Sequence, residues 1–349
     1  MKSIVALTDY KGYFGSKWKA APYRSGYDKN ILKECFGKLG WDIEFLRMQD
    51  IDFKEDWSNK IVIYTSSEET GFYYKNFIED IVLALERTGA IVLPRFDFLR
   101  ANNNKVYMEM LREQLLGEKI SGNSSNFYGS LEELEIDIER DRVKFPCVVK
   151  KAEGAMSRGV FLAKNKTELY NYAKKISHSS HLLSEIRELM RVRKHKGYKK
   201  ESKYQHKFII QNFIPRLKND WKILIYGNHY YILNRGIKQG DFRASGSHFN
   251  YKAGSKSELP EFLLDKVKEI YQIMDVPHLS LDLAWNGENV IVHEFQALYF
   301  GTSTMDFSED LYVFENNKWE IMQADFLQEE EYVWGFVNYF ERHPEIFVK

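Results

Sequence analysis

Two apolar segments joined by an Asn-Gly turn constrain the fold of this chain more than any other feature. Residues 286–289 read Asn-Gly-Glu-Asn and separate Leu279–Trp285 from Val290–Ala297. Asn-Gly between two apolar runs is a strong local signal for a β-hairpin. If the loop has three residues, Asn286 pairs with Val290. The sequence therefore predicts an antiparallel hairpin in this register.

In that register Asp282 lies opposite Glu294, and Gln296 follows two positions later on the same face of its strand. Two carboxylates about 4 Å apart repel by about 4 kcal/mol at an effective dielectric constant of about 20, so the pair favours a bound cation or a shared proton. Three oxygen ligands suit Mg²⁺ that arrives on a nucleotide phosphate better than a cage built only from protein. The alternative is a half-solvated hairpin with ordinary surface acids.

A second segment, residues 145–160, has the composition of a phosphate-binding loop. A short apolar strand ends at Lys150, a loop with Gly154 and Gly159 follows, and a second strand is expected at Val160–Ala163. Lysine supplies a point charge, and small residues let backbone N–H groups approach phosphate oxygens. The segment matches neither the Walker pattern GxxxxGK[ST] nor the dinucleotide pattern GxGxxG. It therefore indicates a triphosphate site of another kind.

The composition is that of an ordinary soluble globular protein. The 349 residues are 44% hydrophobic and 29% charged, which suits two or three domains with a large core. Lys and Arg together number 50, as do Asp and Glu, so no overall field favours nucleic acid or an anionic membrane. Two cysteines without metal-ligand spacing argue against a disulfide framework, and we see no apolar run as long as a signal peptide or membrane span. We expect a cytoplasmic protein without a membrane partner, and the sequence does not indicate the oligomeric state.

Residues 1–98 alternate strands with helices, which predicts a small open parallel sheet. Strands are expected at 4–8, 41–46, 61–65 and 90–94, and helices at 28–39 and 73–88. Ligands bind beyond the carboxyl ends of the strands in such sheets. The loops that carry Arg24 and Ser67 are therefore candidate substrate sites. The alternative is plain surface structure, with Asp28 as a helix N-cap.

Further helices are expected at 102–116, 167–176, 261–274 and 332–340. Residues 178–206 interrupt this pattern with a basic run that contains interleaved tyrosines. Such a run could grip nucleic acid or an anionic carrier. More often it forms a solvated helix followed by a mobile loop.

The lysine segment and the hairpin, in this order, resemble the ATP-grasp superfamily, in which two α+β subdomains hold ATP between them. The type is that of carboxylate–amine ligases, similar to ribosomal-protein glutamate ligases and D-alanine–D-alanine ligases. The resemblance covers roughly residues 100–300 and implies an ATP-grasp fold preceded by a small open parallel α/β domain. The preceding domain would span 1–98, the central subdomain 99–207 with the insert 178–206, and the C-terminal subdomain 208–349.

The resemblance also assigns residues to ATP and Mg²⁺. Lys105 and Lys150 would neutralise the α- and β-phosphates. The loop that covers the phosphates would include Glu153, Gly154 and Ser157. The strand-to-hinge segment that pairs with adenine would comprise Gln211, Asn212, Phe213 and Ile214. The residues that match the family's metal ligands are Asp282, Glu294 and Gln296.

Three positively charged residues resemble the catalytic positions of the family. Arg235, with Lys222, would offset the charge that develops on the transferred phosphoryl group. Arg243 would hold the donor carboxylate or an oxyanion, together with the backbone of Ser245 and Gly246. His293 follows the strand period to the face opposite Glu294 and is expected to be structural.

Four positions depart from the family pattern. Lys151 replaces a customary proline, and Asn212 stands where many members have glutamate. Lys222 replaces an arginine, which keeps the charge but loses the bidentate fork. Gln296 replaces an asparagine, and the longer amide can still present a carbonyl oxygen to Mg²⁺.

The resemblance implies ATP-dependent ligation of a small-molecule carboxylate and an amine. The carboxylate would take the γ-phosphoryl group to give ADP and an acyl phosphate, and the amine would then displace phosphate to form an amide. Two alternatives stay open: a small-molecule kinase on the same fold, and a non-catalytic ATP-binding module.

Overall fold

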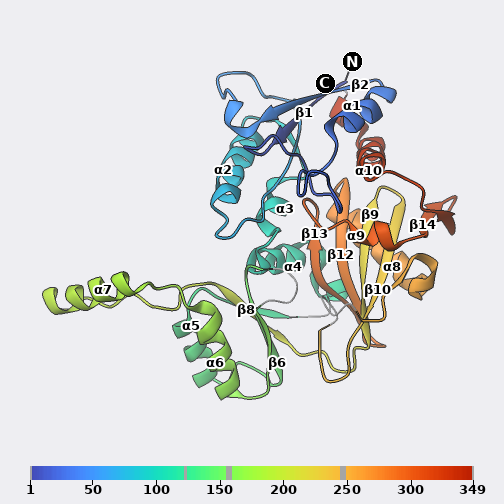
Figure 1. The fold of residues 1–349 in the computed structure, drawn as a ribbon. Helices are drawn as coiled ribbons and strands as arrows, with labels where there is room; N and C mark the ends of the chain where they lie inside the picture. The colour runs from blue at the N-terminus through green and yellow to red at the C-terminus, as the bar shows by residue number, and fades with distance from the viewer. Residues whose placement is uncertain (1, 122–123, 155–158, 244–248, 348–349) are drawn as a thin grey trace.

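The computed structural model describes residues 2–121, 124–154, 159–243 and 249–347 (Figure 1). Its helices are α1 (Lys29–Lys38), α2 (Tyr73–Arg87), α3 (Phe96–Ala101), α4 (Lys105–Ser121), α5 (Leu131–Glu139), α6 (Lys166–Ser177), α7 (Leu182–Lys194), α8 (Glu261–Met274), α9 (Ser303–Phe307) and α10 (Gln328–Arg342). Its strands are β1 (Lys2–Thr8), β2 (Trp41–Arg47), β3 (Ile61–Tyr64), β4 (Ile91–Leu93), β5 (Ser125–Tyr128), β6 (Cys147–Lys151), β7 (Val160–Ala163), β8 (Phe208–Asn212), β9 (Asn219–Tyr226), β10 (His229–Gly236), β11 (Lys252–Ala253), β12 (His278–Trp285), β13 (Val290–Gln296), β14 (Asp310–Glu315) and β15 (Lys318–Gln323).

The N-terminal sheet is parallel throughout, in the order β2-β1-β3-β4. This confirms the open parallel α/β layer that the alternation of strands and helices predicts. The α1 helix begins where expected, because the Asp28 carboxylate accepts the N–H groups of Asn30 at 2.8 Å and Ile31 at 3.3 Å. An N-cap of this kind satisfies donors that have no partner inside the helix.

Two antiparallel sheets follow and face each other across the middle of the molecule (Figure 1). The smaller has the order β5-β8-β6-β7 and packs against α5 and α6 around Phe208, Leu134 and Leu169. The larger has the order β13-β12-β9-β10-β14-β15, with β11 paired to β10. Apolar side chains of β9 and β12 share one core with those of α8. This two-sheet arrangement is the α+β architecture that the ATP-grasp resemblance implies.

The predicted hairpin is present, but its loop is longer than expected. Trp285 pairs with Val290 instead of Asn286, so the loop comprises residues 286–289. Between the pairs Leu283–Val292 and Asp282–Glu294, a β-bulge with one extra residue in β13 shifts the register by one. This shift restores the pairing of Asp282 with Glu294. The predicted carboxylate pair is therefore confirmed, although the register that led to it is wrong near the turn.

The last helix packs against the first domain. The buried face of α10 contributes Phe336 and Phe340 to the core that contains Ile4, Leu32 and Phe36. Figure 1 shows α10 beside α1, with both chain ends at the same end of the molecule. The segment assigned to the C-terminal subdomain thus returns to cover residues 1–98. In the part of the chain that the structure describes, no helix is both long and apolar enough to cross a membrane.

Candidate active site

The two predicted phosphate lysines converge. Lys105 is the first residue of α4, and its ammonium donates to the Gly154 carbonyl at 2.8 Å while its N–H donates to the Ala152 carbonyl at 2.8 Å. Lys150 lies on β6. Burial lowers the pKa of Lys150, Glu109 and Glu294 raise it, and the like charge of Lys105 lowers it. Lys150 thus lies within electrostatic range of Lys105 and of Glu294, a predicted metal ligand on the larger sheet.

A buried carboxylate that the sequence analysis missed supports this pair. Glu109, one turn after Lys105 on α4, is 1% exposed and forms an ion pair of 2.6 Å with Arg112. Its Oε2 accepts the hydroxyl of Ser125 at 2.7 Å, and that hydroxyl accepts the side-chain amide of Gln211 at 2.8 Å. Its Oε1 is buried without a hydrogen-bond partner among the described residues. Only its i,i+4 spacing from Lys105 could have singled it out.

The three predicted metal ligands, Asp282, Glu294 and Gln296, lie on β12 and β13, and we call them the metal edge. Asp282 and Glu294 are register partners, and Gln296 lies opposite Ser280 on the same strand pair. The Oδ1 atom of Asp282 is buried without a hydrogen-bond partner among the described residues. The Gln296 amide nitrogen donates to Asn102 at 2.8 Å, which leaves its carbonyl oxygen as a ligand. Two carboxylates and an amide oxygen fit Mg²⁺, which takes its remaining ligands from phosphates and water.

Arg235 and Lys222 lie beside the metal edge. The guanidinium of Arg235 binds Asp220 in a bidentate pair at 2.7 and 2.8 Å and reaches Asp282 at 2.8 Å. The Lys222 ammonium donates to Ser280 at 2.9 Å and lies 3.6 Å from Asp282. Burial alone would raise the pKa of Asp282, but the charges of Arg235 and Lys222 outweigh it and lower the pKa. Both cations therefore hold Asp282 ionised and oriented, and a direct contact with phosphate stays a prediction.

His293 departs from the expected position. It sits at the β-bulge, which removes the strict alternation that would turn it away from Glu294. Burial and the charge of Lys150 are the leading causes that lower its pKa to about 3, and Asp282 opposes them. The imidazole of His293 therefore lies within range of the charges of Lys150 and Asp282, so the expectation that it faces away from them is not met, and its structural role stays a prediction.

The predicted adenine segment divides into two parts. Gln211 pairs with Val148 on one side and Ser125 on the other, so it belongs to the interior of the sheet. Asn212 is exposed and its amide donates to Ser124 at 3.1 Å. The Phe213 N–H donates to the Pro146 carbonyl, just before β6, at 3.3 Å, and Ile214 continues toward β9. Asn212 ends β8 as the register partner of Cys147, and Phe213 and Ile214 begin the connection to β9, while their contact with adenine stays a prediction.

Two predicted loops lie partly outside the described residues. Ser157, Ser245 and Gly246 are among the residues that the structure does not describe. Glu153 lies close enough to Lys207 to raise the pKa of that lysine, which burial lowers. Arg243 is paired with Asp241 at 3.0 and 3.1 Å. In this structure Arg243 is thus held by its own loop, and its role toward a donor carboxylate stays a prediction.

The role of Ser67 toward a substrate stays a prediction. Its hydroxyl donates to Glu69, whose other oxygen accepts the Tyr74 N–H at 2.6 Å, so Ser67 belongs to the cap of α2. The neighbouring Glu68 faces the metal edge instead. The Glu68 side chain is exposed to water. Desolvation and the charge of Glu294 nevertheless raise its pKa, whereas a hydrogen bond from Asn103 lowers it.

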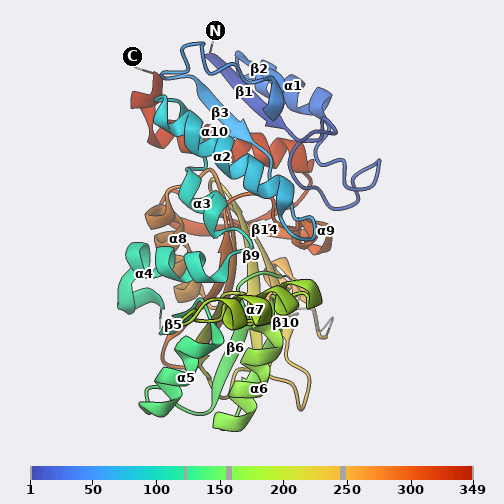
Figure 2. The same cartoon turned by 90° about the vertical axis from the view of Figure 1, so that its left-hand side faces the viewer.

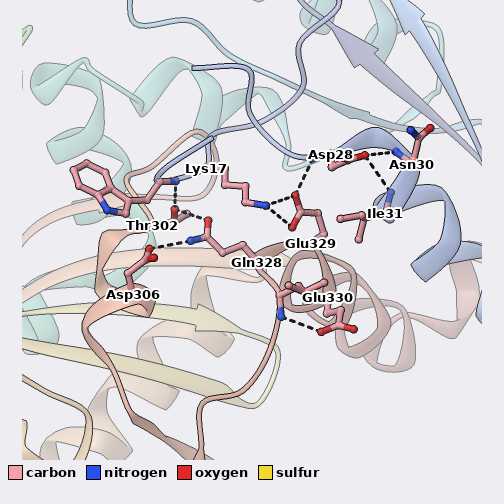
Figure 3. A network of polar contacts seen from close by, with 11 residues as sticks. Lys17, Asp28, Asn30, Ile31, Thr302, Asp306, Gln328, Glu329 and Glu330 are labelled. Carbon is pink, nitrogen blue, oxygen red and sulfur yellow. Dashed lines mark hydrogen bonds and ion pairs between the residues drawn. The ribbon is translucent and has the colours of Figure 1, made fainter. Parts of the chain in front are cut away.

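The loop that carries Arg24 is anchored on both sides (Figure 3). Lys17 binds the buried carboxylate of Glu329 at 2.8 and 2.9 Å, and the N–H of Asp28 donates to the same carboxylate at 2.8 Å. The N–H of Trp18 donates to Thr302 at 2.7 Å. Between these anchors Arg24 is exposed and lies close enough to Glu68 to lower its pKa. The charges of Arg24 and Glu294 therefore both reach Glu68, and a contact of Arg24 with a substrate stays a prediction.

The sequence of residues 103–308 matches the model of the RimK-like ATP-grasp domain. The chain belongs to the RimK-like ATP-grasp family. The matched segment contains both lysines, the hinge and the metal edge. The ATP-grasp assignment made from the sequence motifs is therefore confirmed, while the role of each site residue stays a prediction.

Solved structures share the architecture at low sequence identity, whereas no curated protein matches the sequence. D-cycloserine synthetase DcsG has a TM-score of 0.53 at 13% identity, covering 97% of this chain and 99% of its own. D-alanine–D-alanine ligase from Bacillus anthracis has a TM-score of 0.48 at 13% identity, covering 99% of each chain. A RimK domain ATP-grasp protein from Sphaerobacter thermophilus has a TM-score of 0.45 at 13% identity, covering 84% of this chain and 90% of its own. At this identity the likeness establishes the fold alone.

Proposed function

We propose that this RimK-like ATP-grasp protein is an ATP-dependent carboxylate–amine ligase that releases ADP and phosphate. The observation that carries the proposal is the convergence of Lys105 and Lys150 with the metal edge of Asp282, Glu294 and Gln296. Cations on one side and oxygen ligands on the other match the two ends of a magnesium-bound triphosphate. Membership of the RimK-like ATP-grasp family and the fold shared with a D-cycloserine synthetase support the ligase class.

The chain's own residues divide the work of the first step. Lys105 and Lys150 would hold the phosphates, and Asp282, Glu294 and Gln296 would hold Mg²⁺. When bound, the metal ion neutralises charge on the β- and γ-phosphates and aligns the transferred group. Arg235 and Lys222 keep Asp282 ionised for this purpose. Arg243 is the candidate clamp for the incoming carboxylate.

The chemistry needs no nucleophilic side chain. A carboxylate oxygen of the donor attacks the γ-phosphorus, the bond to the β-phosphate oxygen breaks, and ADP leaves. The amine nitrogen then attacks the acyl carbon, phosphate leaves, and the amine loses a proton. We place the amine beside Glu68, since its carboxylate would attract an ammonium group to the metal edge. Both substrates are small molecules in this proposal.

An incubation with Mg-ATP, pooled carboxylates and excess hydroxylamine tests the proposal, with ADP, AMP and hydroxamate measured together. We expect ADP and a hydroxamate, because hydroxylamine intercepts an acyl phosphate. A phosphorylated product with ADP but no hydroxamate would identify a kinase on this fold instead. Formation of AMP would contradict the proposed site of phosphoryl attack.

A further inference from the structure

Helix α7 projects from the central subdomain and stands clear of the rest of the molecule in Figure 1, and in Figure 2 it lies in front of the other elements, toward the viewer. The chain leaves and returns at one place, where the Ser179 N–H donates to the Lys203 carbonyl at 2.9 Å and the His206 N–H donates to the Ser177 carbonyl at 3.0 Å. We call residues 180–202 the arm. The flanking residues 177–179 and 203–206, which we call the stalk, are joined to each other by these backbone hydrogen bonds. The two ends of the arm are therefore held together.

The acidic side chains of α7 are engaged within the arm and its base. Glu188 forms an ion pair of 2.6 Å with Arg191 and accepts the Tyr198 hydroxyl at 2.8 Å and the Glu201 N–H at 3.1 Å. Glu185 pairs with Lys203 at the stalk. These contacts fix the orientation of α7 against the returning chain. They also leave the opposite side of the helix without an acidic group.

That opposite side is an apolar stripe. Its members are Leu182, Leu183, Ile186, Leu189 and Met190, which are 75%, 70%, 45%, 61% and 59% exposed. Their spacing of three, four and seven residues places them along one side of the helix. A contiguous exposed apolar surface of this kind marks an interaction site, whereas single exposed apolar residues need no explanation.

Free cations accompany the stripe. Arg187, Arg193, Lys194, Lys196 and Lys199 are all exposed, and none forms an ion pair within the fully described segment 178–206 or with any other described residue. That segment holds eight lysines and arginines against three glutamates, whereas the whole chain has equal numbers of both signs. Most of the excess positive charge thus lies on α7 and on the loop that follows it.

We propose that α7 docks on an anionic lipid surface, with the apolar stripe at the boundary between headgroups and acyl chains and the cations against the headgroups. A short helix with one apolar side and several basic residues without acidic partners is typical of interfacial membrane binding. Lysine and arginine beside such a helix are attracted by anionic headgroups. This inference does not depend on the reaction that the active site carries out.

The distribution of side chains favours lipid over a protein groove. The stripe is entirely aliphatic and offers none of the aromatic anchors that dominate protein interfaces. Helix α7 ends at Lys194, and two further cations, Lys196 and Lys199, follow in the loop. A protein groove that accepts only the helix would not contact them. A broad anionic plane contacts all of them at once. Pairing with a second copy of α7 would instead bring like charges together along the stripe.

Sedimentation of the full-length protein with defined vesicles tests the inference. We expect binding to phosphatidylcholine vesicles with roughly one-third phosphatidylglycerol, much weaker binding to pure phosphatidylcholine, and loss of binding at high salt because exposed charges are screened. The double variant Leu183→Glu, Leu189→Glu should reduce the partition coefficient at least about a hundredfold, since each substitution removes an exposed leucine that the bilayer would bury and adds a negative charge. The matched control Ile136→Glu, at an exposed apolar residue of α5, should bind like wild type.

Light scattering and ATP binding complete the test. Retained ATP binding by the double variant would show that its loss of vesicle binding is specific to the arm. Wild-type protein that stays in the supernatant with anionic vesicles would overturn the proposal. A wild-type dimer that the double variant converts to a monomer, without vesicle binding by either, would overturn it in favour of a second copy as the occupant.

Discussion

Lys150 carries a positive charge where the two antiparallel sheets approach each other. Burial lowers its pKa, and Glu109 and Glu294 are the nearby charges that raise it. A cation held in this way has lost part of its hydration before a phosphate arrives. Its attraction for a triphosphate is therefore stronger than that of a surface lysine.

Lys150→Ala should weaken ATP binding about tenfold to a hundredfold, the range for losing one charged hydrogen bond of about 1.5–3 kcal/mol. Titration calorimetry with a non-hydrolysable ATP analogue measures the change. Lys151→Ala is the matched control, because it removes the neighbouring charge on the same strand and should leave affinity within a few-fold. Unchanged affinity in Lys150→Ala would move the phosphate site elsewhere.

Glu109→Gln should lower the free energy of unfolding by about 3 kcal/mol, because it leaves the buried charge of Arg112 without its partner. Urea denaturation measures this change. The exposed Glu113→Gln, one turn further along α4, should change stability by less than about 0.5 kcal/mol. Equal effects of the two substitutions would show that the Glu109–Arg112 ion pair does not contribute to the free energy of unfolding.

Residues with a distinctive local context were predictable, whereas their neighbours were not. Lys105, Lys150 and the two metal carboxylates stand in motifs with a chemical reason for their spacing, and the structure brings them together. Glu109 reads like any helical surface acid until β5 and β8 bury it. The choice between Ser67 and Glu68 depends on one backbone turn, which sequence composition does not specify.

At the scale of elements, periodic segments gave accurate bounds. The helix expected at 261–274 is found at those residues, because its apolar spacing and the preceding Pro260 define both ends. No element was predicted for residues 117–144, where β5 and α5 lie. The strand β5 has only four residues and a mixed polar composition, so its identity depends on pairing with β8.

The bulge in β13 shows why hairpin register is hard to read from sequence. The loop is one residue longer than the Asn-Gly signal suggested, and one extra residue in β13 compensates for it. Two opposite deviations leave Asp282 and Glu294 paired. The extra residue is also what brings His293 into the site, an effect that strand periodicity alone could not predict.

The arm is an element that the site does not need. Replacement of residues 180–202 by a short Gly-Ser linker should leave ATP binding and hydrolysis within about twofold of wild type, because the stalk ends are already joined by a hydrogen bond of 2.9 Å. Steady-state ATPase measurements and calorimetry check this expectation. A collapse of ATP hydrolysis in a folded variant would make the arm part of the active site.

At the scale of the whole molecule, the first domain depends on the last helix. Glu329 of α10 is 0% exposed and binds both Lys17 and the backbone of Asp28 (Figure 3). The apolar side of α10 completes the core beneath β1. The division into consecutive domains could not be refined from sequence, since the amphipathic pattern of α10 does not say which surface it covers.

Glu329→Gln should lower the free energy of unfolding by about 2 kcal/mol, because the partly exposed Lys17 and a backbone donor lose their charged partner. Thermal unfolding measures the stability, and limited proteolysis should cut the loop around Arg24 faster. Glu341→Gln, an exposed acid on the same helix, is the control and should match wild type. Slower or unchanged proteolysis would contradict the anchoring role.

Overall composition concealed one feature of the molecule. The chain as a whole is neutral, and this balance argued against an anionic membrane as a partner. The basic run at 178–206 departs from this balance, and the structure places that run on one projecting arm. A net charge summed over the chain carries no information about such a separation.

The central claim is that Asp282, Glu294 and Gln296 hold the Mg²⁺ of a bound nucleotide, and Glu294→Gln tests it most directly. ATP binding is titrated with and without Mg²⁺, and turnover is measured on the same preparations. The account predicts that the variant keeps its fold and its metal-independent ATP binding but loses the Mg²⁺-dependent increase in ATP affinity. Its turnover should fall at least about a hundredfold. A folded variant with wild-type Mg²⁺-dependent turnover would contradict the assignment of this site.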